Sequence, residues 1–331
     1  MEVIILTIVE PIINKKRKPL HELLPLDKPL RINIDPCDAC NFQCDFCFHG
    51  KTNSFHGGVM SLETFEKVIE QIKEFDGLIN VIQLFGLGEP LLNKNVPFFI
   101  RRLKEEKISE KVKITTNGSL LTPTLIDSLI DAGLDEFVLS LNGLKDLDFE
   151  RIANVKVSFS TMFDNIKYIY ANRKECYFHI KIIGEYFTEN EKKYFIDEVG
   201  QYADSINIDG LINHWSGVKV TNLHRQQYAV NEDFLQEWSI CALCFYELMI
   251  HSDGSVSPCA VDWQKDKQNL GNIYDSTLKK IWNSEFRRKI IMSFLKGEEN
   301  PYMPCSVCEY PLSGASVNLD PYKEELLKKY V

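Results

Sequence analysis

Four of the ten cysteines lie together in the segment CDACNFQCDFCFHG, residues 37–50, and they are the residues with the clearest chemistry. Their spacing is C-x2-C-x3-C-x2-C, with phenylalanines between the thiols. A disulfide hairpin, a zinc site and an iron–sulfur loop all fit such a group. Clustered cysteines in a reducing compartment more often mark metal or redox chemistry than disulfides, so we expect a metal site here.

The last three of these cysteines, Cys40, Cys44 and Cys47, form the shorter pattern C-x3-C-x2-C. Iron–sulfur cubanes take cysteine ligands at such spacings because a tight loop can wrap one cluster. Three thiolates for four irons leave one iron open, where a small molecule can bind and react. Zinc remains an alternative on spacing alone, since Cys37 completes two C-x2-C pairs.

Short β-branched segments alternate with amphipathic segments of helical period between residues 30 and 210, and these elements must position the cysteines. The expected strands are 30–35, 79–85, 111–117, 136–142, 177–183 and 205–209. The expected helices are 61–75, 94–106, 122–132, 161–173 and 189–202, with starts at Ser61 and Thr122. Strands that alternate with helices indicate an α/β protein with a parallel sheet.

One face of these strands is apolar and the other is polar. The polar face includes Arg31, Asn33, Lys113, Ser140, His179, Lys181, Asn207 and Asp209. A parallel sheet covered by helices on both faces is apolar on both. We therefore expect the polar face to line a wide lumen, with an antiparallel sheet that has one wet face as the alternative.

Composition and charge narrow the class of protein. The 331 residues allow one large domain with a small one, or two medium domains. The 38 basic and 47 acidic residues give a net charge of −9, which argues against a nucleic-acid-binding surface. The apolar start carries Glu2 where a secretion signal needs a positive charge, and it is shorter than the roughly 20 residues that span a bilayer. We expect a cytoplasmic protein with no membrane partner.

Beyond residue 240 the composition of the sequence changes. Five more cysteines appear there, at positions 241, 244, 259, 305 and 308. A turn-like SDGS at 252–255 and an expected helix at 276–295 accompany them. We expect a second, smaller unit organised around sulfur.

Several motifs, in this order, resemble the radical S-adenosylmethionine (SAM) superfamily: CNFQCDFC, GLGEP (86–90), TTNG (115–118) and SLNG (140–143). The resemblance covers roughly residues 30–210 and implies a partial (β/α)6 TIM-type barrel. It also implies a [4Fe-4S] cluster on Cys40, Cys44 and Cys47, with the amino and carboxylate groups of SAM on the open iron. Such enzymes make a 5′-deoxyadenosyl radical that takes hydrogen from an unactivated C–H bond in a site closed to water.

The same resemblance implies contacts to the cofactor. Phe46 would pack the adenine, and the segment from Gly86 through Gly88 to Glu89 would receive the methionine amino group. The family motif begins with two adjacent glycines, whereas Leu87 separates them here, so the individual hydrogen-bonding groups stay open. Active sites of such barrels lie at the carboxyl ends of the strands, so ribose or carboxylate contacts are expected from Asn117, Ser140 and Asn142.

The later cysteines resemble the SPASM and twitch extensions, which hold auxiliary [4Fe-4S] clusters. A two-cluster version needs further cysteines after the last pair, and none follows Cys308. The resemblance therefore implies one auxiliary cluster on Cys259, Cys305 and Cys308, with Cys241 as the fourth ligand and Cys244 as its competitor. A zinc ribbon is the alternative. The expected domains are an N-terminal extension (1–29), the partial barrel (30–215) and a small cysteine-rich SPASM/twitch-like unit (216–331).

These expectations together describe a radical SAM enzyme of oxidoreductase type. It would dehydrogenate a small polar substrate such as a sugar or aminocyclitol, with the auxiliary cluster as electron acceptor and flavodoxin or ferredoxin as reductant. The candidates for the base are Lys181, His179 and Asp209, and His214 and Trp215 lie near the expected substrate entrance. Two alternatives stay open: maturation of a ribosomally made peptide, and a non-catalytic zinc or electron-transfer protein.

Overall fold

The computed structural model describes residues 8–9, 18–52, 57–211, 215, 238–263, 269–311 and 317–330. The strands within these ranges form one ten-stranded sheet in the order β1-β7-β6-β5-β4-β3-β2-β8-β9-β10. All six expected strands are present, and neighbours in chain order pair in parallel. They are β2 (Arg31–Ile34), β3 (Ile79–Leu84), β4 (Ser109–Thr116), β5 (Glu136–Ser140), β6 (Tyr177–Ile183) and β7 (Ser205–Asp209).

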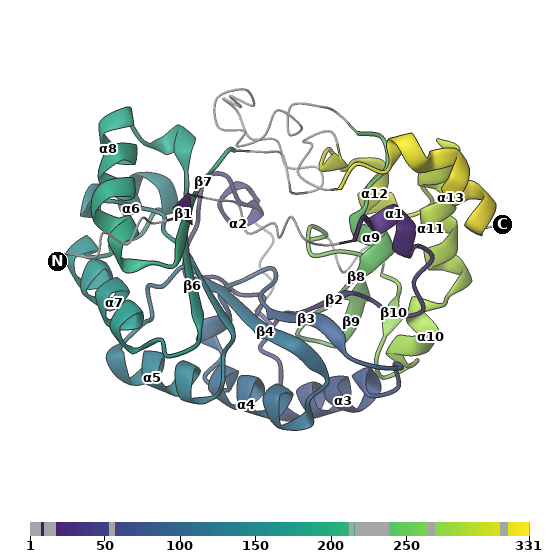
Figure 1. Ribbon diagram of the computed structural model, residues 1–331, viewed down its shortest axis with the longest axis horizontal. Helices are drawn as coiled ribbons and strands as arrows, with labels where there is room; N and C mark the ends of the chain where they lie inside the picture. The colour runs from purple at the N-terminus through teal and green to yellow at the C-terminus, as the bar shows by residue number, and fades with distance from the viewer. Residues whose placement is uncertain are drawn as a thin grey trace.

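Helices connect these strands and lie outside the arc that the sheet forms (Figure 1). They are α3 (Leu62–Ile72), α4 (Val96–Glu106), α5 (Pro123–Asp131), α6 (Asp146–Ala153), α7 (Phe159–Asn172) and α8 (Glu189–Tyr194). Two predicted helix starts are confirmed by their caps. The Ser61 side chain accepts a hydrogen bond from the Thr64 N–H at 3.0 Å, and Thr122 accepts one from the Leu125 N–H at 3.2 Å.

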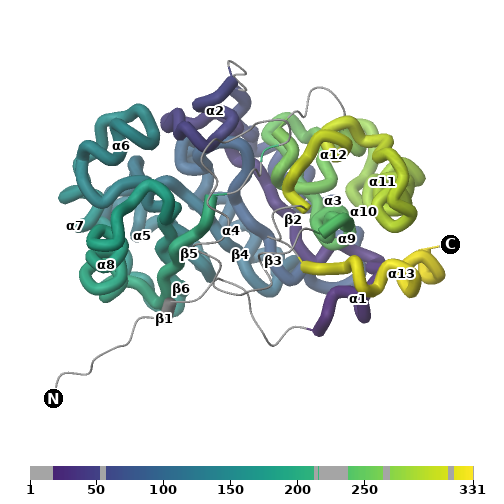
Figure 2. Tube along the Cα trace, turned by 90° about the horizontal axis from the view of Figure 1, so that it is seen from above, coloured from purple at the N-terminus to yellow at the C-terminus, as the bar shows by residue number. Residues whose placement is uncertain are grey.

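The sheet continues into the cysteine-rich part of the chain. The strand β8 (Glu247–Ile250) pairs in parallel with β2, and β9 (Ser255–Ser257) and β10 (Gly271–Asn272) extend the sheet as antiparallel neighbours. At the other edge, β1 (Ile8–Val9) pairs with β7. Within the described parts of the chain, β1 and β10 are the two ends of the sheet order. The sheet is therefore an open, partial barrel, as expected (Figure 2).

The remaining helices are short or belong to the C-terminal unit. They are α1 (Leu20–Leu23), α2 (Phe48–Lys51), α9 (Leu243–Tyr246), α10 (Leu278–Trp282), α11 (Glu285–Lys296), α12 (Met303–Ser306) and α13 (Lys323–Tyr330). Figure 1 shows α2 inside the arc of strands, on the side opposite the connecting helices. Of the helices in the described ranges, none is long and apolar enough to cross a membrane.

Three segments depart from the sequence expectation. The helix α6 was not expected. The helix expected at 189–202 is α-helical only to Tyr194 and continues as π and 3₁₀ turns. The single helix expected at 276–295 is two helices, because Ser284 begins α11 by accepting a hydrogen bond from the Arg287 N–H at 3.2 Å. Apolar residues recur through both halves, so periodicity alone could not locate the break.

The two faces of the sheet differ as the alternation of side chains predicted. Residues of the apolar face, including Ile32, Ile82, Val112, Phe137 and Phe178, are fully buried in the main hydrophobic core. The intervening polar residues face the inside of the arc, because successive side chains of a strand point to opposite faces. The hydrogen bond of 3.0 Å from Gln83 Nε2 to Thr115 Oγ1 joins two of them across neighbouring strands.

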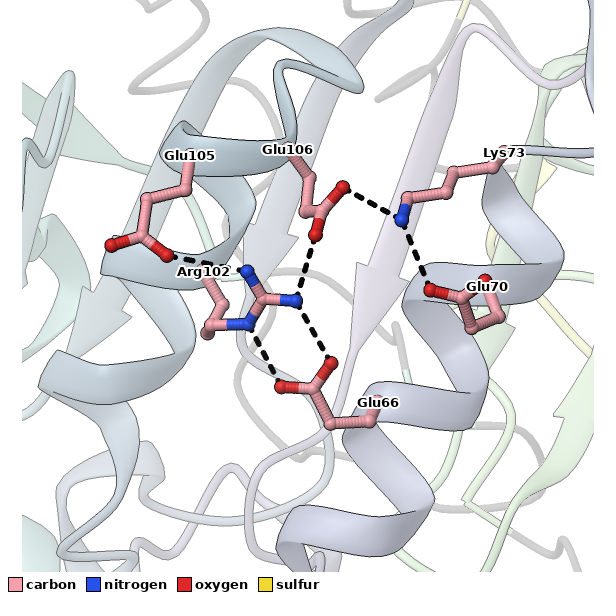
Figure 3. A network of polar contacts seen from close by, with 6 residues as sticks. All are labelled: Glu66, Glu70, Lys73, Arg102, Glu105 and Glu106. Carbon is pink, nitrogen blue, oxygen red and sulfur yellow. Dashed lines mark hydrogen bonds and ion pairs between the residues drawn. The ribbon is translucent and has the colours of Figure 1, made fainter.

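Helices α3 and α4 are joined by a polar network and by a ring stack. In the network, Arg102 donates hydrogen bonds to Glu66 at 2.9 and 3.1 Å and to Glu106 at 2.7 Å, and Lys73 pairs with Glu106 at 2.6 Å (Figure 3). Exposed ion pairs contribute little free energy because water screens them. The apolar contact between the same helices is therefore expected to dominate their attachment.

That apolar contact is the stack of Phe65 on Phe99, with ring centroids 3.9 Å apart and both side chains fully buried. Phe99→Ala should lower the free energy of unfolding by about 3–5 kcal/mol, through lost burial and an unfilled cavity. Phe98→Ala is the matched control, since Phe98 is 39% exposed. Urea unfolding followed by circular dichroism measures both, and equal losses would contradict the assigned role of the stack.

Candidate active site

The first cysteine loop follows the carboxyl end of β2 and closes on itself through backbone hydrogen bonds. The Cys47 N–H donates to the Cys44 carbonyl at 3.0 Å, and the Gly50 N–H donates to the Cys47 carbonyl at 3.1 Å. A Cβ on Gly50 would stand 2.2 Å from the Cys44 carbonyl oxygen. Only glycine, which has no Cβ, lets the backbone pass so close to the Cys44 carbonyl oxygen.

The thiols of this loop act on one another. Burial, followed by the charges of neighbouring groups that include Cys47, raises the pKa of Cys40 to about 12 and that of Cys44 well above its usual range. Burial also raises the pKa of Cys47 to about 11. Thiolates gathered in this way need positive charge to stay ionised, which iron supplies on binding.

The spacing of the thiols bears on the kind of metal site. No group of three or more His, Cys, Asp or Glu side chains in the described ranges converges to hold a metal ion. An iron–sulfur cubane takes one cysteine per iron, so its ligand sulfurs stand further apart than those of a single ion. Three soft thiols that act on one another in one partly buried loop fit that cluster.

The end of β3 packs directly under the loop. A Cβ on Gly88 would stand 2.1 Å from the Ala39 carbonyl oxygen and 2.4 Å from that of Cys37, so the two backbones are in contact. The Glu89 N–H donates to the same Ala39 carbonyl at 2.9 Å. His49 adds a third link, because its Nε2 donates to the Leu87 carbonyl at 2.9 Å.

Glu89 joins the ends of β3 and β4 from a buried position. Its carboxylate accepts hydrogen bonds from the Leu91 N–H at 3.0 Å, the Thr116 hydroxyl at 2.6 Å and the Asn117 N–H at 2.8 Å. Burial raises the pKa of this carboxyl, and the three donors lower it again. The protein's own donors thus hold Glu89 in place, and its contact with the methionine amino group stays a prediction.

Asn117 holds the cysteine loop from the other side. Its amide nitrogen donates to Asn41 Oδ1 at 3.0 Å, and its Oδ1 accepts from the Ser119 N–H and hydroxyl at 3.0 and 2.7 Å. Asn41, which lies between two cluster cysteines in the sequence, closes the triangle by donating to Ser119 Oγ at 2.8 Å. This triangle was not foreseen, although the TTNG motif pointed to its location.

The other predicted cofactor contacts lie around the same mouth. The ring of Phe46 is half-buried, with its centroid 5.8 Å from that of Tyr186. Ser140 ends β5 directly opposite Lys181 of β6. Gly86 leaves the end of β3 beside Asp35, where a Cβ would stand 2.5 Å from the carboxyl carbon. The roles of Phe46, Gly86, Ser140 and the half-buried Asn142 toward SAM stay predictions.

The three candidate bases lie together on the inner face of β6 and β7. Lys181 Nζ is 3.0 Å from Asp209 Oδ2, and His179 Nδ1 is 2.6 Å from Ser205 Oγ. Burial, followed by the charges of Lys181 and Lys113, lowers the pKa of His179 to about 4. His179 is therefore neutral at pH 7. His214 lies outside the described residues.

Four side-chain atoms of the inner face, from three residues, have no hydrogen-bond partner among the described residues. They are both amide atoms of Asn33, Nε2 of His179 and Oδ1 of Asn207. Asn33 is fully buried, and His179 is 1% exposed. Buried polar groups are nearly always paired, so unpaired ones in a concave site indicate places for ligand atoms. Sequence reasoning placed Asn33 on the polar face but did not single it out.

An aromatic group joins the two cysteine units. The buried ring of Phe48, next to Cys47, stacks on Trp263 at 5.3 Å between centroids and 17° between planes. Trp215 meets Phe48 edge-on at 4.9 Å, and Leu87 packs beside it. Trp263 lies four residues after Cys259, so these rings connect the loops that carry the two sulfur groups. Trp263 was missed from the sequence because nothing near it forms a motif.

The five later cysteines also act on one another. Burial raises the pKa of Cys259 and Cys305 well above their usual range. The charge of Cys305 adds to the effect on Cys259, the charge of Cys244 adds to the effect on Cys305, and Cys241 and Cys308 contribute to both. Cys241, Cys259 and Cys308 share one apolar cluster. Cys244 instead belongs to the main core, and its thiol donates to the Cys241 carbonyl at 3.3 Å.

Comparison with known protein families identifies two domains. The model described as the radical SAM superfamily matches residues 34–193. Residues 34–193 form a radical SAM domain. A second model, described as an iron-sulfur cluster-binding domain (SPASM), matches residues 241–309. The two domains imply SAM and iron–sulfur clusters as cofactors. This radical SAM chain is therefore an enzyme, which argues against the non-catalytic alternative.

Relatives of this radical SAM chain differ in reaction. The cysteine-type anaerobic sulfatase-maturating enzyme of Clostridium perfringens is 26% identical over 332 residues, covering 85% of this chain and 86% of that enzyme. A probable GTP 3',8-cyclase of Methanococcus maripaludis is 34% identical over 125 residues, covering 38% of this chain. That match spans only 40% of the cyclase.

Solved structures agree in fold with this radical SAM chain. Native anSMEcpe with bound AdoMet has a TM-score of 0.61 at 19% identity, covering 91% of this chain and 96% of that one. BtrN in complex with AdoMet and 2-DOIA has a TM-score of 0.55 at 17% identity, covering 84% and 91%. At these identities the likeness concerns the fold alone.

The contact under the first cysteine loop predicts the effect of one methyl group. Gly88→Ala should displace the loop and remove its cluster, lowering the iron content from about eight to about four per chain. Iron and sulfide analysis after anaerobic purification measures this. Gly133→Ala is the control: its φ of +93° disfavours alanine, but its nearest neighbour is the flexible Lys104 side chain at 3.2 Å, so it should keep its iron. Full iron in Gly88→Ala would contradict the packing described.

Proposed function

We propose that this radical SAM enzyme dehydrogenates a small polar alcohol and uses one auxiliary [4Fe-4S] cluster as the electron acceptor. The observation that carries the proposal is that the five later cysteines influence one another's charge within one unit, which supplies enough thiols for one four-ligand cubane. One acceptor cluster matches the one electron that must leave the substrate after hydrogen abstraction.

The bound cluster and SAM supply a 5′-deoxyadenosyl radical. The carbinol C–H bond of the substrate breaks, and its hydrogen atom forms a C–H bond in 5′-deoxyadenosine. The substrate carbon then becomes a carbonyl as the hydroxyl proton leaves to a base and one electron leaves to the auxiliary site. The substrate is thus oxidised by two electrons in all, and the protein must supply a proton acceptor.

The inner face of β6 and β7 supplies that acceptor. Lys181 Nζ lies 3.0 Å from Asp209 Oδ2, so the amine faces a carboxylate that can take up the proton. Asp209 also accepts a hydrogen bond from Asn207 Nδ2, and the pair of donors orients its carboxylate. We assign proton acceptance to Asp209. Neutral His179, which uses Nδ1 toward Ser205, presents Nε2 to a substrate hydroxyl.

The same face favours an uncharged or weakly charged substrate. Its two lysines are partnered, Lys181 by Asp209 at 3.0 Å and Lys113 by Glu136 at 3.8 Å. The groups without partners in the described ranges are amide and imidazole atoms, which suit hydroxyl and amino groups better than phosphates. Asn33 is the most buried of these and is the contact we assign to a hydroxyl on the β2 side.

A second candidate function is modification of a ribosomally made peptide. It is favoured by the likeness to the sulfatase-maturating enzyme over 85% of this chain. The structure of Streptococcus suis SuiB bound to the precursor peptide SuiA has a TM-score of 0.54 at 16% identity. A peptide substrate would need the same radical and a different second step.

Deuterium transfer separates the two candidates. The reduced enzyme is incubated with SAM and either carbinol-deuterated sugars and aminocyclitols or deuterated peptides, and 5′-deoxyadenosine is analysed by mass spectrometry. Deuterium from an alcohol, together with the matching carbonyl product, supports the proposal. Deuterium from peptides alone, or alcohol turnover with no oxidised product, overturns it. Cys40→Ala should abolish transfer, whereas Cys176→Ala, a buried thiol outside both cysteine groups, should keep it.

The fourth ligand of the auxiliary cluster is expected to be Cys241. Cys241 shares an apolar cluster with Cys259 and Cys308, whereas the Cys244 thiol lies in the main core and donates to the Cys241 carbonyl at 3.3 Å. Cys241→Ala should therefore lose about four irons per chain. Cys244→Ala should keep about eight, and the reverse pattern would exchange the two roles.

A further inference from the structure

We propose that the ion pair of half-buried Arg31 with buried Glu247 sets the reduction potential of the auxiliary cluster, with Glu247 as a positioning residue for the loop of Cys259. The proposal concerns a pair of residues outside both cysteine groups. It holds whether the substrate is an alcohol or a peptide.

The pair links the two halves of the chain. Arg31 begins β2, the strand that leads to the first cysteine loop, and Glu247 begins β8 directly opposite it. Arg31 Nε donates to Glu247 Oε2 at 2.7 Å, and Arg31 Nη2 contacts the same oxygen. The Glu247 side chain is only 1% exposed. A buried arginine–carboxylate contact of this kind is strong and geometrically specific.

Glu247 also holds the auxiliary loop. Its other oxygen, Oε1, accepts a hydrogen bond from the Ala260 N–H at 3.1 Å, and Ala260 follows Cys259 directly. One buried carboxylate therefore contacts the barrel through Oε2 and the cysteine loop through Oε1. Displacing it would move the backbone beside Cys259.

The charge of Glu247 lies beside the auxiliary cysteine loop. Oε1 of Glu247 lies 3.1 Å from the backbone nitrogen of Ala260, the residue that follows Cys259. Reduction of a cluster adds a negative charge, so a negative neighbour lowers the potential and a positive one raises it, most strongly where water is excluded. Arg31 neutralises this carboxylate and so keeps the cluster able to accept an electron.

Tyr246 holds the Arg31 guanidinium in position to neutralise the Glu247 carboxylate. Its Nη2 donates to the Tyr246 hydroxyl at 3.0 Å, and the guanidinium carbon lies 5.1 Å from the Tyr246 ring centroid. Burial opposes the charged form of Arg31, but the charges of Glu247 and Tyr246 outweigh it and raise its pKa. The pair is thus a fixed, net-neutral unit.

A second ion pair offers a matched control. Arg173 Nε and Nη2 donate to Asp204 at 2.9 and 2.8 Å, and Asp204 also accepts the Phe178 N–H at 2.8 Å. This pair has the same chemistry, an arginine on a carboxylate that also holds a backbone amide. It lies beside β6 and β7, four strands or more along the sheet from β8.

The test is a potentiometric titration followed by electron paramagnetic resonance, on the full holoenzyme without substrate. The signal that SAM leaves unchanged belongs to the auxiliary cluster. Glu247→Gln leaves Arg31 uncompensated and should shift the auxiliary midpoint to higher potential. The double variant Arg31→Met with Glu247→Gln should return it to the wild-type value. Asp204→Asn should leave it unchanged.

Several outcomes would overturn the proposal. These are an unshifted potential in Glu247→Gln, a double variant that stays shifted, or an equal shift in Asp204→Asn. Loss of the auxiliary iron from Glu247→Gln would also overturn it, because glutamine still accepts the Ala260 N–H. The SAM-dependent signal of the first cluster shows in each variant that the barrel is folded.

Discussion

The site depends on the contact of two backbone segments, the first cysteine loop and the turn that follows β3. Gly88 lies so close to the Ala39 and Cys37 carbonyls that no side chain fits between the two segments. Glu89 and His49 then fasten the loop to this turn by hydrogen bonds. Because the sheet holds β2 and β3 in fixed register, the loop inherits that rigidity. A cluster with one open iron needs such a frame, since the small molecule it binds must meet a substrate in one orientation.

The two sulfur centres are parts of one sheet. β2 leads into the first cysteine loop, and its partner β8 follows the first two auxiliary cysteines. The stacked rings of Phe48 and Trp263 join the two loops at the mouth, and Arg31 and Glu247 join them at the base of the strands. The inner face of the same sheet carries buried amide and imidazole atoms that lack partners among the described residues. In the proposed function, these atoms bind the polar substrate.

Much of the fold and the kind of cofactor could be predicted from the sequence. The six strands could be predicted from the alternation of apolar and polar side chains. The second unit could be predicted from the five cysteines after residue 240. The order of the motifs led to the superfamily, and the fold class was confirmed. The prediction of one continuous helix over residues 276–295 was wrong. A capping serine, Ser284, separates α10 from α11 without changing the apolar pattern of the sequence. The domain boundaries and the roles assigned to individual site residues stay predictions.

The sequence by itself determined the chemistry, since the cysteine spacing and the neighbouring motifs are local and a thiol binds soft metal wherever it lies. Only the tertiary structure decided which distant groups act together. Arg31 and Glu247 are 216 positions apart and Phe48 lies far from Trp263, so no window of sequence joins them. Their contact arises because β8 returns to pair with β2 and extends the sheet. Strand pairing of this kind depends on the packing of the whole chain, which local patterns do not specify.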